Sequence, residues 1–241
     1  MINAQKLNIF STYSIFLFIS LLISLPKIFY FNYGDSFDNS LKLILEFNDT
    51  LYLPIIKVYS EFNLNPSFSE IKNLNLISYP FFGLLINSIF YKVFGLYSLI
   101  VIEILSIFIF HLIFYKIFIL SKIEKINSIL FANFFFISIY LFIDISNFLN
   151  ISYIKTISNS YEILFNLRFP RPLISNLFLF SFLYLSYKFY VVNEFNKKLL
   201  LSLIIISSLT LHVFFYFFLF QLILLLIIYS SKFKTKIVKI F

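Results

Sequence analysis

Residues 99–120 read LIVIEILSIFIFHLIFYKIFIL, and Glu103 and Lys116 are the only charged residues in this run of 22. About 20 predominantly apolar residues are needed for a helix to cross a hydrocarbon core of roughly 30 Å. The run therefore predicts a transmembrane helix. Apolar blocks of similar character occur elsewhere along the chain, at 9–28, 129–143, 173–192 and 199–229.

The composition agrees with several such helices. The 241 residues are 61% hydrophobic and 12% charged, with a mean hydropathy of +0.94, whereas a soluble domain is about half apolar and a quarter charged. These values exclude a soluble globular domain. The absence of cysteine excludes a disulfide framework and a thiolate metal site. The net charge of +8 comes from lysines beside the apolar blocks, which indicates a positive-inside excess and no nucleic-acid partner.

We expect an all-α fold: one polytopic transmembrane bundle over residues 1–241, embedded in membrane lipid. The block 199–229 has 31 residues, too many for one comfortable span, so we divide it near His212; one long tilted helix is the alternative. Residues 80–94 predict a helix at the interface that leads into the second span. The predicted spans are 9–28, 96–119, 129–145, 173–190, 199–211 and 213–229.

The charge distribution predicts the orientation of these six spans. With the N-terminus inside, the inner ends hold 11 lysines against Glu124 and Glu194, and the outer loops hold eight basic and eight acidic residues. This arrangement follows the positive-inside rule. It places both termini in the cytoplasm and both long polar loops, 32–79 and 146–170, on the extracytoplasmic face.

An acidic cluster follows the first predicted span. Gly34 permits a tight turn, and Asp35 and Asp38 can converge on a metal ion or on a substrate hydroxyl. The alternative is a solvated turn in which Asp38 caps the next helix. We take Asp35 and Asp38 as candidate catalytic residues.

Basic residues mark the second polar loop. The two arginines of the chain, Arg168 and Arg171, lie in the sequence RFPRP, where two prolines hold the backbone extended. The planar guanidinium group matches phosphate, so these arginines, with Lys155 of the same loop, are candidate substrate-binding residues. An interfacial anchor for anionic lipid is the alternative.

Three polar residues fall within the apolar blocks: Glu103, His111 and His212. An ionisable residue inside a membrane is costly and is a functional candidate by default, although Glu103 could instead hold helices together by a hydrogen bond. Its candidate partners on other helices are Asn133, Asn176 and Gln221. His111 is displaced by about 80° around the helix from Glu103, which predicts that the two do not share a face. The chain has only two histidines, far apart in the sequence, so no metal site can be proposed from them.

The order of features in residues 10–120 resembles the start of the GT-C superfamily of membrane glycosyltransferases. These enzymes begin with a span, an acidic first outer loop and interfacial helices. A segment with proline, aromatic residues and a closing glycine then leads into the second span. That segment here is YPFFGLLINSIFYKVFGL, residues 79–96. The paired short spans around His212 also resemble later helices of the family.

The resemblance implies transfer of a sugar from a polyprenyl-phosphate-linked donor to an acceptor outside a bacterial inner membrane. By position, Asp35 matches the catalytic aspartate of the family, which would act as general base on the acceptor hydroxyl. Family members usually have eight or more spans, so the resemblance fits a shortened or incomplete member. It assigns no cofactor and leaves a divalent metal open. The alternatives are a non-catalytic membrane component, a transporter that uses Glu103, or another envelope-glycan polymerase or ligase.

Overall fold

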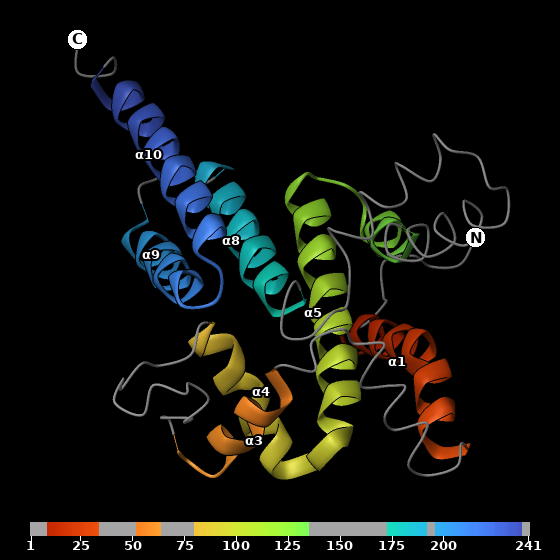
Figure 1. The fold of residues 1–241 in the computed structure, drawn as a ribbon. Coiled ribbons are helices and arrows are strands. Elements are labelled where there is room, and N and C mark those ends of the chain that lie inside the picture. Colours follow the sequence, from red (N-terminus) through yellow and green to blue (C-terminus); the bar gives the residue numbers. More distant parts are fainter. Residues whose placement is uncertain (1–8, 34–51, 64–79, 135–172, 192–195, 238–241) are drawn as a thin grey trace, which may run out of the picture.

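The computed structural model describes residues 9–33, 52–63, 80–134, 173–191 and 196–237, and the regular elements within these ranges are all helical (Figure 1). This confirms the predicted all-α class. A further helix occupies residues 125–134 up to the end of that described range. The elements in chain order are α1 (Ile9–Tyr33), α3 (Leu53–Ser60), α4 (Phe81–Phe94), the 3-10 turn η3 (Gly95–Tyr97), α5 (Ser98–Leu120), α8 (Leu173–Val191), α9 (Lys197–Leu211) and α10 (Phe215–Ile237).

The helix pair α4–α5 is joined by a corner whose conformation the sequence explains. Pro80 is extended (φ −88°, ψ 103°) and precedes the first turn of α4. Gly95 ends α4 with φ 58° and ψ −138°, in a region that glycine adopts without steric penalty. Figure 1 shows α4 and α5 rising side by side from this corner. The predicted helix over 80–94 and the predicted start of the next helix at 96 are thus confirmed to within two residues.

Helix length and apolarity in the described residues do not confirm the six predicted spans. In the part of the chain that is described, Phe81–Leu120 is the one helical stretch long and apolar enough to cross a membrane. Phe10–Leu25 and Phe215–Ser230 are apolar but shorter. Helix α9, with 15 residues, is about 22 Å long and falls short of a span. Helix α8 is 19 residues long but includes Asn176 and Lys188. The predicted third span is described only as far as residue 134.

Residues 199–229 are divided near His212 into two helices, as predicted, and the crossing of the membrane by each helix stays a prediction. Helices α9 and α10 form a hairpin whose turn is residues 212–214, with the Phe214 amide donating to the Thr210 carbonyl at 2.7 Å. Asn196 caps α9, since its side-chain oxygen accepts from the Leu199 amide at 3.2 Å. The turn docks on α4, where the Phe82 amide donates to the His212 carbonyl at 3.1 Å.

Helix α3 lies inside the predicted outer loop 32–79. The sequence also predicts short interfacial helices in this loop, one capped by Asp38 and one that begins with the capping box SFSE at residues 67–70, and both predicted starts lie outside the described residues. Pro54 stands in the first turn of α3, where its missing amide proton costs nothing. Ile56 and Tyr59 are buried, and the Tyr59 ring meets the Phe81 ring of α4 edge to face at 6.1 Å. This contact ties α3 to α4.

The described helices pack around two hydrophobic clusters. The first cluster gathers residues of α1, α3, α4, α5 and the helix at 125–134, together with Leu173 at the start of α8. The second lies between α8, α9 and α10, which run side by side in Figure 1, and contains Phe182, Phe189, Leu203 and Ile228. The Phe180 ring of α8 joins the two halves through contacts with Phe110 and Phe114 of α5.

Candidate functional site

The predicted catalytic and phosphate-binding residues fall outside the part of the chain that is described. These residues are Asp35, Asp38, Lys155, Arg168 and Arg171. Their common location on one face therefore stays a prediction. The described ranges include the three intramembrane polar residues, Glu103, His111 and His212.

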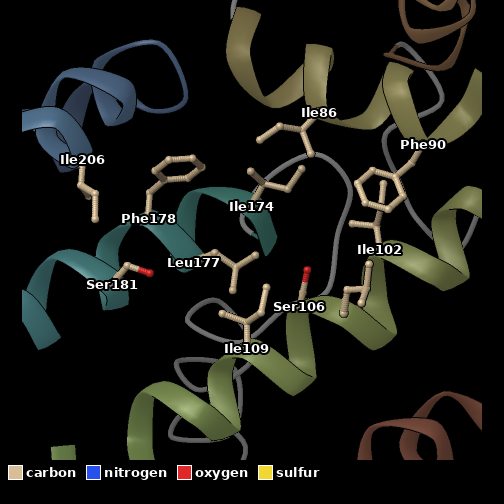
Figure 2. Close-up of a pocket in the computed structure, with 11 residues that line it drawn as sticks. Ile86, Phe90, Ile102, Ser106, Ile109, Ile174, Leu177, Phe178, Ser181 and Ile206 are labelled. Atoms are coloured by element: carbon tan, nitrogen blue, oxygen red, sulfur yellow. The ribbon is translucent and has the colours of Figure 1, made fainter. Parts of the chain in front are cut away.

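An apolar cleft lies between α4, α5, α8 and α9 (Figure 2). Its volume is about 310 Å³, at the lower end of the range of about 300 to 1,000 Å³ for ligand pockets. Nine of the eleven lining residues are apolar, and the other two are Ser106 and Ser181. Figure 2 shows both serine hydroxyls among the apolar side chains that surround the cavity.

Helical spacing explains how the cleft is built. On α5 the lining positions are 102, 105, 106 and 109, and on α8 they are 174, 177, 178 and 181. Steps of three and four residues place side chains on one face of a helix, so two facing stripes form the walls. Leu105 and Ile109 are each more than a third exposed, so the cleft opens along this edge of α5. Such a site suits a hydrocarbon chain with few polar groups.

A second polar feature lies between α1 and α5. Ser24 Oγ of α1 donates a hydrogen bond to Glu103 Oε1 at 3.3 Å, and the Glu103 side chain is 1% exposed. Eight residues further along α5, the His111 ring stacks on the Phe16 ring of α1 at 5.5 Å. The pairs 24 with 103 and 16 with 111 show that the two helices run antiparallel. We call this interface the α1–α5 seam.

The prediction that Glu103 and His111 lie on different faces is therefore wrong. Positions 103, 107 and 111 form an i±4 ridge, and such a ridge winds slowly around the helix. A second helix that follows the ridge meets both residues despite the angle of about 80° between them. His111 Nδ1 also lies 2.8 Å from the carbonyl oxygen of Ile107 on the same ridge, which can only accept a hydrogen bond.

The seam on α1 consists mostly of small hydroxyl residues. Thr12, Phe16, Ser20 and Ser24 are buried at intervals of four residues. Ser20 Oγ donates to the Phe16 carbonyl at 2.7 Å, which satisfies its hydroxyl within the helix. Residues on the opposite side of α1, such as Phe18 and Leu22, are exposed. Small hydroxyl side chains facing a neighbour and large apolar ones facing outward are typical of helices that associate in lipid.

The structure describes further contacts of the polar residues. Ser24 donates a hydrogen bond to Glu103, and Gln221, one of the candidate partners of Glu103, makes no side-chain hydrogen bond to the described residues. The His212 side chain is exposed at the α9–α10 turn, and its carbonyl makes the contact with α4.

The lining serines and Ser24 were not predicted as site residues. The signal was weak because Ser106 and Ser181 are single hydroxyls within apolar runs, and only the facing arrangement of α5 and α8 brings them together. Within the described ranges, no group of three or more His, Cys, Asp or Glu residues could hold a metal ion. No protein-family model, curated protein or solved structure matches this chain.

Proposed function

We propose that this chain is a multi-pass membrane protein that holds the hydrocarbon tail of a lipid-linked substrate in the cleft between α4, α5, α8 and α9. The cleft is the observation on which the proposal depends, because its walls are apolar and it opens along one side of α5. A tail can enter this cleft directly from the hydrocarbon core of the bilayer, without passing through water. The proposal locates the protein in a bacterial inner membrane, with both termini in the cytoplasm.

The distribution of side chains supports the membrane environment. Among the described residues, more large apolar side chains are exposed than are buried, and the buried set includes many serines with Glu103, His111 and Gln221. In the most apolar window of Phe81–Leu120, 44% of the residues are buried. A helix that is apolar on all sides belongs in a protein core or in a bilayer, and the apolar residues that the protein leaves partly or fully exposed favour the bilayer.

The chemistry that we propose follows from the resemblance to GT-C glycosyltransferases. The acceptor hydroxyl oxygen attacks the anomeric carbon of the donor sugar, and the bond from that carbon to the phosphate oxygen breaks. Asp35, with Asp38 beside it, takes the hydroxyl proton as general base. Arg168, Arg171 and Lys155 stabilise the negative charge of the departing polyprenyl phosphate.

A photoaffinity experiment tests the cleft. The probe is a polyprenyl phosphate with a diazirine in its tail, added to the full chain in nanodiscs. We expect crosslinks to residues that line the cleft and a loss of at least about tenfold in crosslinking in Ser181→Phe, whose ring fills the cavity. Ser181→Ala is the matched control and should crosslink like the wild type. Equal crosslinking of all three proteins would exclude the cleft as the tail site.

A transfer assay tests the chemistry separately. Asp35→Asn should abolish sugar transfer from a polyprenyl-phosphate donor while tail crosslinking persists, because the amide cannot accept the proton. Asp38→Asn tests the second carboxylate in the same way. Transfer at the wild-type rate by Asp35→Asn would remove that residue from the base role and leave the lipid-binding part of the proposal standing.

The transporter alternative is less well supported by the geometry of Glu103. Its bond to Ser24 is an interhelical contact of the kind that holds membrane helices together. The variant Glu103→Gln keeps a side-chain oxygen that can accept this hydrogen bond but cannot carry a charge. Substrate uptake into vesicles that disappears in this variant would favour transport over glycosyl transfer.

A further inference from the structure

A patch of exposed apolar side chains surrounds the corner between α4 and α5. We call it the corner patch, and its members are Phe62, Ile89, Lys92, Val93, Phe94 and Tyr97. Phe62 is 78% exposed and Val93 is 69% exposed. Ile89 and Val93 are one helical turn apart on α4, so they lie on the same side of the helix. The patch joins the end of α3 to the corner at which α5 begins.

Phe62 has an unusual backbone conformation for its side chain. Its φ of 63° lies in the left-handed region, which residues other than glycine seldom adopt. The hydrogen bonds from the Asn63 amide to the Val58 carbonyl and from the Phe62 amide to the Tyr59 carbonyl form a Schellman ending for α3. This ending projects the Phe62 ring outward. Lys92 Nζ lies 3.7 Å from the centre of that ring.

The position of the corner relative to α5 indicates what covers the patch. Helix α5 has 23 residues and is about 34 Å long, which matches a hydrocarbon core of roughly 30 Å. If α5 crosses the bilayer, the residues just before Ser98 lie at the level of the lipid headgroups. Lysines also follow the other end of α5, at 122 and 125. Aromatic and basic residues at both ends of a span are typical of membrane interfaces.

We infer that the corner patch is an anchor at the extracytoplasmic membrane interface, where its apolar and aromatic side chains enter the hydrocarbon boundary and Lys92 binds lipid phosphate. The inference rests on the membrane span of the proposed function and not on glycosyl transfer. In water, the exposed Phe62 ring would gain only its weak contact with Lys92. At the interface the same ring is buried in lipid, and the ammonium group above it meets anionic phosphate.

The absence of tryptophan allows a direct measurement of depth. Three variants of the full chain, Phe62→Trp, Tyr97→Trp and Ile109→Trp, each contain a single tryptophan. They are reconstituted in phosphatidylcholine and phosphatidylglycerol vesicles whose lipids are brominated near the carbonyl or near the chain middle. We expect quenching at 62 and 97 to be strongest with shallow bromines, and quenching at 109, in the middle of α5, to be strongest with deep bromines.

The outcomes separate the inference from the proposal beneath it. Quenching at 62 and 97 by aqueous acrylamide but by neither brominated lipid, with deep quenching at 109, would overturn the anchor and leave the span intact. Acrylamide quenching at all three positions would remove the span and the anchor together. Tyr97→Trp keeps the test decisive if Phe62→Trp does not fold.

The role of Lys92 is tested in the Phe62→Trp protein. Quenching by brominated phosphatidylglycerol is compared with quenching by brominated phosphatidylcholine. Because one lysine near an anionic surface changes binding by about fivefold, Lys92→Glu should lower the preference for phosphatidylglycerol by at least about that factor. Lys198→Glu, the same charge change at the exposed start of α9, is the control and should leave the preference at 62 unchanged. An unchanged preference in Lys92→Glu would overturn the phosphate contact.

Discussion

The α1–α5 seam and the bundle of α8, α9 and α10 hold their helices together by different means. In the seam, Ser24 of α1 donates to Glu103 of α5 and Phe16 stacks on His111, and among the α1 side chains whose burial is described Phe16 is the one large apolar side chain that is buried. The bundle encloses Phe182, Phe189, Leu199, Leu203 and Ile228. The seam therefore depends on close approach and directional bonds, whereas the bundle depends on the fit of large side chains.

This difference has a consequence for energetics in lipid. Lipid tails are as apolar as leucine, so burying apolar area between helices stabilises a membrane protein less than it stabilises a soluble one. Packing of complementary shapes still contributes, because a void forfeits its dispersion contacts. We therefore expect substitutions that create cavities in the bundle to cost more than substitutions that remove one hydrogen bond from the seam.

The largest expected effect is in the bundle. Phe182 is fully buried, and Phe182→Ala should lower the free energy of unfolding by about 3 kcal/mol, because it removes the ring and leaves a cavity. Reversible unfolding in mixed micelles, followed by far-UV circular dichroism, measures this change. Phe220→Ala removes an equal ring from the outward side of α10, where Phe220 is 49% exposed, and should cost less than about 0.5 kcal/mol. Equal losses would show that the bundle is not packed as described.

Gln221 is the polar exception within the bundle region. Its side chain is fully buried, and neither amide atom has a hydrogen-bond partner among the described residues. Gln221→Met has a similar volume and no unsatisfied polar group, so it should raise the free energy of unfolding by about 1 to 2 kcal/mol. The same micelle assay measures it. A destabilised Gln221→Met would indicate that the amide has a polar partner, and the contrast between bundle and seam would then be weaker.

The N-terminal cap of α9 stabilises the protein through a hydrogen bond and not through packing. The Asn196 side-chain oxygen accepts from the Leu199 amide. Asn196→Ala should lower the free energy of unfolding in the same micelle assay by about 1 kcal/mol, because that amide loses its partner. Asn196→Asp keeps the acceptor oxygen and should retain most of the stability. If both variants lose the same amount, the cap contributes nothing to the bundle.

Helix breaks that depend on a few neighbouring residues were predicted correctly from the sequence. The hairpin of α9 and α10 follows from the length of 199–229 and the weak apolarity around His212. The corner at Gly95 follows from a glycine after an apolar helix, and its positive φ explains the choice of residue. In both places the signal lies within a few residues of the break.

Features that depend on how helices meet were predicted less well. Ser24, which donates to Glu103, is 79 residues away from it in sequence and differs in no way from the many other serines of the chain. The cleft likewise exists only because the stripes of α5 and α8 face each other. Of the six predicted spans, the described residues support one by length and apolarity, within Phe81–Leu120, because α8 includes Asn176 and Lys188 and α9 has only 15 residues. Periodicity indicates a face but not the neighbour that covers it.

The smallest expected effect concerns the seam itself. Ser24→Ala removes the hydroxyl that donates to Glu103, and interhelical hydrogen bonds in membranes contribute about 0.6 kcal/mol on average. Ser14→Ala is the matched control on the same helix, because Ser14 is exposed and donates only to the Phe10 carbonyl of its own helix. A double-mutant cycle with Glu103→Leu, which removes the acceptor oxygen, isolates the contact between the two side chains. A coupling energy near about 0.6 kcal/mol would show that the seam is held by many small contacts. A loss in Ser24→Ala as large as that in Phe182→Ala would instead make this single bond the main link between α1 and α5, and the contrast with the bundle would no longer hold.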